Sequence, residues 1–173
     1  MLIFEGELKS KIDLSSLGRK LKEISDNNNL LAIQMLDSLN IWSLAHIESA
    51  VWHSINALQN NHLISNTLAI ELLLYLAGER QISKAIEEYG LKEDTKKVLG
   101  IIIGINQDKI LVAFNELLSF YNLELIKKIL NPTPEKYEYF TKKFIQEGFI
   151  KNNLSYQGIE TVILQKIALL ALG

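Results

Sequence analysis

The segment from Ser65 to Ile82 constrains the fold most, because it joins a nearly all-apolar helix to a clear start and a clear end. The start carries three candidate N-capping residues, Ser65, Asn66 and Thr67. Gly78 can take the left-handed conformation that closes a helix. A helix that is apolar on most faces has to be buried, so we predict a central helix with one open stripe. On a helical projection that stripe holds Thr67, Glu71, Leu74 and Gly78.

The composition is that of an ordinary globular protein. The 173 residues, 48% hydrophobic and 22% charged, are enough for one domain with a substantial core. The net charge of −2 gives no general attraction to nucleic acid or to an anionic membrane, so a nucleic-acid site has to be a local patch. Arg19 and Arg80 are the two arginines of the sequence, which limits the positions for bidentate phosphate binding.

The sequence also indicates the compartment. It contains no cysteine, which excludes disulfides, thiol nucleophiles and zinc–thiolate sites. The first five residues lack the basic region and long apolar run of a signal peptide. The most apolar stretch, 159–172, is too short to cross a bilayer and contains Glu160 and Lys166. We therefore expect a soluble, cytoplasmic protein without a membrane partner.

The hydrophobic pattern predicts a single α+β domain, 1–173, in which a small, mainly antiparallel or mixed sheet packs against several helices. Alternating or β-branched runs predict strands at 2–8, 30–36 and 98–105. Amphipathic or apolar runs predict helices at 14–24, 44–60, 82–89, 110–121, 134–147 and 159–172, besides the central helix that starts after its capping residues and ends at Gly78. Asp13 and Ser43 are expected N-caps, and Pro134 is expected at the first position of its helix.

The helix at 44–60 carries two histidines whose role has several readings. A projection places His46 and His53 on one polar face with Ser49, Asn56 and Asn60. Their spacing of seven residues is too long for paired zinc ligands, which favour i and i+4. We expect a polar face open to water, with RNA contact by its amides and imidazoles as the second reading.

Arg80 also has two readings. It can pair with Glu79, Glu71 or a carbonyl group and so help to end the central helix. It can instead bind phosphate or stack on a base, with Gln81 and Lys84 adding a hydrogen-bonding group and a charge. Leu74, on the predicted open stripe beside Gly78, would then form a notch for an unstacked base.

The last helix is apolar after Lys166, so it has to be buried either in the core of its own domain or against a partner protein. Its candidate partner contacts lie at helical spacing, namely Ile163, Ile167, Leu170 and Ala171. The sequence contains no nucleophile–base motif, phosphate loop or dinucleotide-binding glycine motif, and no metal or cofactor is expected. The sequence therefore shows no set of residues that would carry out catalysis.

The run LLYLAGERQI, followed by KAIEEYG, resembles the small kinase-binding subunit of the KEOPS complex, the PRPK-binding protein family. The likeness extends from Leu44 to Ile103 and resumes in the C-terminal helix. It implies a non-catalytic subunit that binds and stimulates the kinase-like ATPase subunit of KEOPS and captures the CCA tail of tRNA. That assembly helps to place a threonylcarbamoyl group on an adenosine beside the anticodon, and other KEOPS subunits would be indirect partners.

The resemblance and the stacking argument together give a candidate RNA site made of Asn66, Leu74, Tyr75, Arg80, Gln81 and Lys84. The C-terminal helix would dock on the kinase. Two alternatives stay open at this point. One is a small hydrolase or transferase using His46, Glu48 and His53. The other is a kinase-binding scaffold without RNA binding.

Overall fold

The computed structural model describes residues 1–126 and 130–172. These residues form two compact units, each built from separate stretches of chain. Unit 1 comprises 1–38, 67–69 and 90–129, and unit 2 comprises 39–66, 70–89 and 130–173. This division does not test the expectation of a single domain, which stays a prediction.

The elements follow one another in the order strand, helix, strand, then a long helical run before the third strand. In chain order they are β1 (Leu2–Leu8), α1 (Leu14–Asn27), β2 (Ala32–Asp37), the 3₁₀ turn η1 (Ser38–Asn40), α2 (Leu44–Gln59), α3 (Leu68–Ala77), α4 (Ile82–Tyr89), β3 (Lys97–Ile103), α5 (Gln107–Phe120), β4 (Leu123–Leu125), α6 (Pro134–Gln146) and α7 (Tyr156–Leu172).

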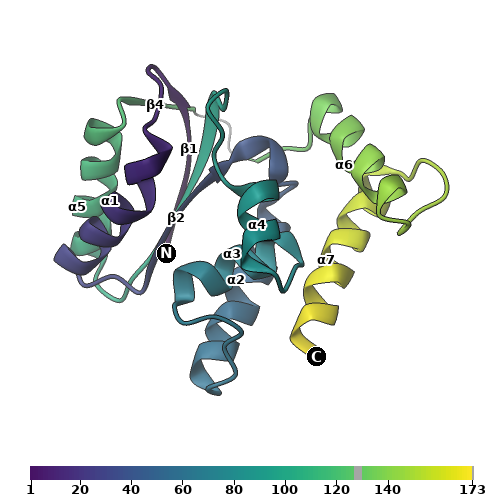
Figure 1. The fold of residues 1–173 in the computed structure, drawn as a ribbon, viewed down its shortest axis with the longest axis horizontal. Helices are drawn as coiled ribbons and strands as arrows, with labels where there is room; N and C mark the ends of the chain where they lie inside the picture. Colours follow the sequence, from purple (N-terminus) through teal and green to yellow (C-terminus); the bar gives the residue numbers. More distant parts are fainter. Residues whose placement is uncertain (127–129, 173) are drawn as a thin grey trace. The chain divides into compact units, whose positions relative to one another are not determined.

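Unit 1 contains a four-stranded sheet in the order β2-β3-β1-β4, and each pairing is antiparallel. The central strand β3 pairs with β1 through Phe4 opposite Gly100, and with β2 through Met35 opposite Gly100. Helices α1 and α5 lie side by side over one face of this sheet (Figure 1). The fold class is therefore the predicted α+β.

The core between the sheet and these two helices forms because side chains alternate along each strand. Phe4, Ile33, Val98 and Ile102 point into it and meet α1 and α5 residues such as Leu117. The rings of Phe4 and Phe114 meet edge to face, with centroids 5.1 Å apart. Edge-to-face contact is a favoured arrangement for aromatic pairs, so Phe4 is held firmly over the strand opposite it.

Gly100 is the point at which that ring comes closest to the sheet backbone. A Cβ atom added at Gly100 would overlap the Cε1 and Cζ atoms of Phe4. Glycine inside a strand commonly marks such a close approach. Gly100 therefore serves the packing of Phe4 on this strand.

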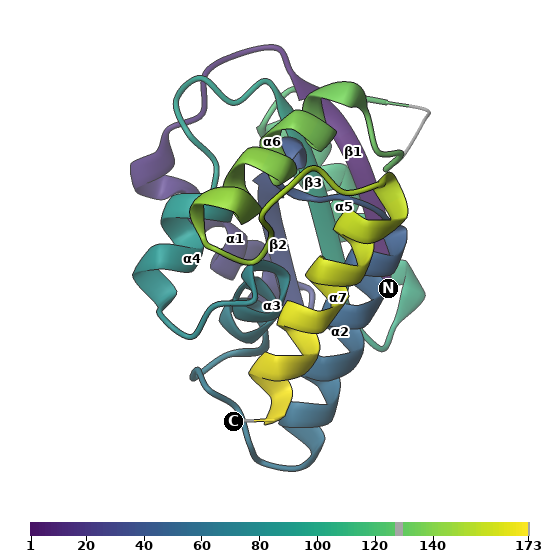
Figure 2. The same ribbon diagram turned by 90° about the vertical axis from the view of Figure 1, so that its right-hand side faces the viewer.

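Unit 2 is built around the parallel pair α2 and α7, which lie side by side along their length (Figure 2). At their beginnings the Ser43 hydroxyl donates a hydrogen bond to the Glu160 carboxylate (2.5 Å). Ser43 also caps α2, because its hydroxyl oxygen accepts from the His46 N–H (3.3 Å). The buried Trp42 ring packs between Phe140 and Tyr156 at this end of the pair.

Two lysines join helices within unit 2. One links α6 to α4, and the other links α7 to the end of α6. Lys143 pairs with Glu88 (2.6 Å) and lies over the Tyr89 ring, while Lys166 pairs with Glu147 (2.9 Å). The Lys143 and Lys166 side chains are only 10% and 14% exposed. Partly buried pairs of this kind are screened less by salt than exposed pairs, so they help to fix these helices.

The predicted elements are confirmed, with small differences in their bounds. The strand at 2–8 and the helix at 82–89 have the predicted bounds, and the N-caps Asp13 and Ser43 are present. Pro134 occupies the first turn of α6 behind the N-cap Thr133. The short β4 and η1 are missing from the prediction because three residues carry too little periodicity to identify an element.

Candidate functional site

The end of α3 places three of the candidate RNA residues, Arg80, Gln81 and Lys84, at or just after a sharp change of chain direction in unit 2. Gly78 has φ +60°, and the Gly78 and Glu79 N–H groups donate to the carbonyl oxygens of Tyr75 (3.1 Å) and Leu74 (3.1 Å). This is the Schellman pattern that ends a helix. The predicted helix-closing role of Gly78 is thus confirmed. We call Glu79, Arg80, Gln81 and Lys84 the Arg80 corner.

Glu79 organises the Arg80 corner. Its carboxylate accepts from the backbone N–H groups of Arg80 (3.0 Å) and Gln81 (3.4 Å), and from the Lys84 ammonium (3.0 Å). Burial works to raise the pKa of Glu79, but the hydrogen bonds from Lys84 and the two N–H groups lower it on balance. The same contact raises the pKa of Lys84. Lys84 is therefore charged but already paired with a carboxylate.

Arg80 is the more available cation of the corner. Its side chain is exposed, and its Nη2 atom donates one long hydrogen bond to the Leu170 carbonyl oxygen of α7 (3.4 Å). No carboxylate of residues 1–126 or 130–172 forms an ion pair with it. Most of its five N–H donors stay open to an anion such as phosphate. Exposed Gln81 adds an amide beside it.

Asn66 is exposed but lies at the other end of α3 from the Arg80 corner. The helix between them has 10 residues, a length of about 15 Å at 1.5 Å per residue. The loop before α3 is held by Glu71, whose Oε2 atom accepts from both the N–H and the hydroxyl of Ser65 (2.9 Å each). The structure therefore does not bring Asn66 together with the other exposed candidates.

The expected open stripe along α3 is wrong. Glu71 and Leu74 have no exposed surface, and Tyr75 is 4% exposed. The Ser65 loop covers Glu71, and the Tyr75 ring is covered by His53 of α2, which stacks on it at 5.6 Å and 18°. Leu74 and Tyr75 are thus core residues, and a notch for a base at Leu74 is absent from this conformation.

The expected solvent-exposed histidine face of α2 is also wrong at His46, which is fully buried. Its Nδ1 atom accepts from the Trp42 N–H (3.2 Å), so its Nε2–H donates to the Leu76 carbonyl oxygen (2.8 Å). Burial lowers the pKa of His46 to about 4; the Leu76 bond opposes this, while Lys143, Lys136 and Lys166 add to it. His46 is a neutral structural link between α2 and α3.

The candidate hydrolase or transferase site does not assemble. Glu48 is exposed, whereas His46 is buried with both ring nitrogens bonded to backbone, and His53 stacks on Tyr75. Burial lowers the pKa of His53 as well. Within the described residues, no cluster of three or more histidine, cysteine or acidic side chains could hold a metal ion.

Trp52 is an exposed aromatic residue that the sequence analysis does not single out. It is 62% exposed and packs edge-on against His53, with ring centroids 4.7 Å apart. A sequence signal for it exists. On a helical projection Trp52 falls outside the apolar stripe of α2, between that stripe and the polar face, so a core position is not expected.

The face of α7 assigned to a partner is covered by the chain itself. Ile163, Ile167 and Leu170 are 4%, 1% and 7% exposed and belong to the buried side of α7, which packs on α2. The helical spacing of these residues is correct, but it marks the internal face. Ala171 is exposed, as are four neighbours at the end of the helix, Gln165, Ala168, Leu169 and Leu172. Leu169 and Leu172 are 63% and 84% exposed.

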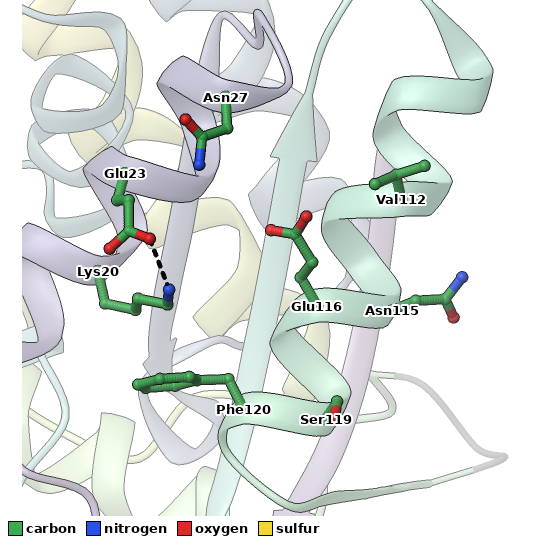
Figure 3. Close-up of a pocket in the computed structure, with 8 residues that line it drawn as sticks. All are labelled: Lys20, Glu23, Asn27, Val112, Asn115, Glu116, Ser119 and Phe120. Atoms are coloured by element: carbon green, nitrogen blue, oxygen red, sulfur yellow. Dashed lines mark hydrogen bonds and ion pairs between the residues drawn. The ribbon is translucent and has the colours of Figure 1, made fainter.

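Unit 1 contains a groove of about 670 Å³ between α1 and α5 (Figure 3). Lys20 of α1 lies over the Phe120 ring of α5 at 4.7 Å and pairs with Glu23 of its own helix (2.8 Å), while Glu116 projects from α5. Charges of both signs, with the cation already paired, do not favour phosphate. The groove therefore adds no second candidate RNA site.

A family model described as kinase binding protein CGI-121 matches residues 9–171 of the chain. The chain belongs to the CGI-121 family. This confirms the resemblance found in the sequence, and it makes kinase binding the property of the family to which the chain belongs. No curated protein matches the chain with significant similarity.

The CGI-121 match covers the Arg80 corner and all of the exposed end of α7 except Leu172. In the part of the chain that the structure describes, no helix is long and apolar enough to span a membrane.

Proposed function

We propose that this chain is the non-catalytic subunit of a KEOPS-type assembly that binds and stimulates the kinase-like ATPase subunit and recruits tRNA through its CCA tail. It would thereby support formation of threonylcarbamoyl-adenosine next to the anticodon. Membership of the kinase-binding family supports the first part. The exposed Arg80 corner supports the second, because the Arg80 guanidinium has no ion-pair partner among the described residues and offers a local positive charge on a protein without a general one.

In this proposal the kinase subunit binds the exposed end of α7, at Ala168, Leu169, Ala171 and Leu172. Leu169 and Leu172 are highly exposed apolar side chains within one turn, and covering them would contribute to an interface. Ile163, Ile167 and Leu170 hold that helix on α2 and so act on the contact indirectly.

Replacing Arg80 by alanine is expected to weaken tRNA binding about tenfold, the loss expected from one charge-assisted contact to phosphate. The measurement is titration of intact tRNA and of tRNA trimmed of its CCA tail, at two salt concentrations. The matched control is Arg19→Ala, which removes the other arginine of the chain from an exposed position on α1.

Equal affinity of wild type and Arg80→Ala for intact tRNA would contradict the RNA site. Wild-type protein that binds neither intact nor trimmed tRNA would leave the kinase-binding scaffold as the function of the chain.

Replacing Leu169 or Leu172 by aspartate is expected to weaken binding to the kinase subunit at least tenfold, because a carboxylate would be buried in an apolar contact. The melting temperature and the tRNA affinity should stay unchanged, since both side chains are largely exposed in this chain. Ile167→Asp is the contrasting variant. It should unfold unit 2, because Ile167 is only 1% exposed.

Kinase binding and ATPase stimulation by the two leucine variants are read by calorimetry and by phosphate release. If both stay at the wild-type level, the kinase contact lies elsewhere on the chain.

A further inference from the structure

The chain just before Arg80 lies directly against the last two turns of α7 within unit 2. A Cβ atom added at Gly78 would be 2.9 Å from the Cβ atom of Lys166 and 3.6 Å from its carbonyl carbon. Two residues later, the Arg80 Nη2 atom donates to the Leu170 carbonyl oxygen (3.4 Å). The Arg80 corner and the end of α7 are therefore in contact, although 90 residues of sequence separate the two partners of this bond.

The last turn of α7 gains from Arg80 a cation that its own sequence does not supply. The last four carbonyl groups of an α-helix lack an N–H partner within the helix, and they carry the negative end of its dipole. Leu170 provides one of these carbonyl groups, and residues 169–172 include no basic side chain. A guanidinium held at this position stabilises the turn, as a lysine or arginine near the end of the helix would.

The same turn carries the side chains that we assign to the kinase contact. Leu170 is 7% exposed and belongs to the buried side of α7, whereas Leu169 and Leu172 are 63% and 84% exposed. The positions of these two leucines depend on whether the last turn stays helical. Arg80 holds that turn by its backbone, so it positions the exposed leucines through the helix.

A phosphate bound to Arg80 would compete with this role. The bond from Arg80 to Leu170 is long for an N–H···O contact, so it is readily given up. A phosphate is bound best through two parallel N–H groups, which fix the direction of the guanidinium plane. An anion beside the end of α7 also meets the negative end of the helix dipole, which repels it. Phosphate binding therefore costs the last turn its cation.

We propose that Arg80 is a positioning residue shared by both surfaces, so that a phosphate bound to Arg80 and a kinase subunit bound to the end of α7 weaken each other. This inference rests on the proposed function, in which RNA supplies the phosphate, and it adds a regulatory link between the two contacts. Coupling between two binding sites is reciprocal, so each partner lowers the affinity for the other by the same factor. That factor is about two to ten, the net value of one hydrogen bond.

The first test measures the last turn of α7 in the full chain alone, through hydrogen exchange of the amides of residues 169–172. Arg80→Ala should speed this exchange about threefold, within the range for one hydrogen bond. Arg80→Lys should restore most of the protection, because an ammonium group also stabilises the end of a helix. Saturating single-stranded RNA that ends in CCA should speed exchange in wild type as Arg80→Ala does. The control is Arg19→Ala in unit 1, which should leave the exchange unchanged.

The second test measures the coupling by calorimetry. The kinase subunit should bind wild type about threefold more weakly when the same RNA is present at saturation. Arg80→Ala should bind the kinase subunit about threefold more weakly than wild type without RNA, and added RNA should then change nothing further. Arg19→Ala should behave as wild type does.

The outcomes separate this inference from the proposed function. If wild type binds both partners and neither affinity changes when the other partner is present, the coupling is overturned and the proposed function stands. Equal exchange of residues 169–172 in wild type and Arg80→Ala would show that Arg80 does not position α7, which also overturns the inference. If Arg80→Ala binds RNA as tightly as wild type, the RNA site of the proposed function fails, and the link fails with it.

Discussion

Gly100→Ala is expected to lower the free energy of unfolding by about 3 kcal/mol, at the upper end of what overpacking a core costs. The added methyl group would overlap the Phe4 ring, which is 3% exposed and packed edge-on against Phe114. Neither the strand pairing nor the ring can shift without disturbing β1 and β3. Urea unfolding followed by circular dichroism measures the change.

The matched control is Gly18→Ala on the exposed face of α1, where an added Cβ atom meets no other atom within 4 Å. It should stabilise the protein by roughly 0.5–1 kcal/mol, because alanine is the better helix former. The double variant Phe4→Leu/Gly100→Ala should recover part of the loss, since the smaller side chain leaves room for the methyl group. Equal stability of Gly100→Ala and wild type would show that Phe4 is free to move.

The second large effect is expected from pH, through His46. Its pKa of about 4 in the folded chain lies below the usual value of 6.5, so the unfolded chain takes up a proton at a pH where the folded chain does not. The stability due to neutral His46 is complete above pH 6.5 and is lost as the pH falls toward 4. Between pH 7 and pH 5 we expect a loss of about 2 kcal/mol, at 1.36 kcal/mol per pKa unit.

His46→Gln tests the assignment, because its amide can keep one backbone contact without titrating. The variant should be less stable than wild type at pH 7. Its free energy of unfolding should, however, fall much less than that of wild type between pH 7 and pH 5. His62→Gln, at an exposed position, is the control and should keep that decline. The partly buried His53 contributes in the same direction. If the free energy of unfolding of His46→Gln falls with pH as steeply as that of wild type, other groups cause the acid sensitivity.

The sequence predicts the local structure well because local signals carry it. The bounds of β1 and α4, the N-caps Asp13 and Ser43, and the end of α3 at Gly78 all follow from short-range patterns. The α+β class follows from the order of those elements.

The candidate site is harder to predict because exposure is a tertiary property. A helical projection orders the side chains of α3 but does not say which side is covered, and the Ser65 loop and His53 cover Glu71 and Tyr75. His46 looks polar in the sequence, yet a distant carbonyl at Leu76 and a nearby N–H make its burial favourable. For the same reason the apolar repeat of α7 is assigned to a partner from the sequence alone, although it forms the internal face of the helix.

The pairing of α2 with α7 also sets an order of events during synthesis. The hydrogen bond that joins their beginnings links Ser43 to Glu160, 117 residues later in the chain. A ribosome adding roughly 5–20 residues per second needs about 6 to 23 s to cover that distance. During that interval the apolar side of α2 lacks its cover, so the nascent chain offers chaperones a binding site that the finished protein closes.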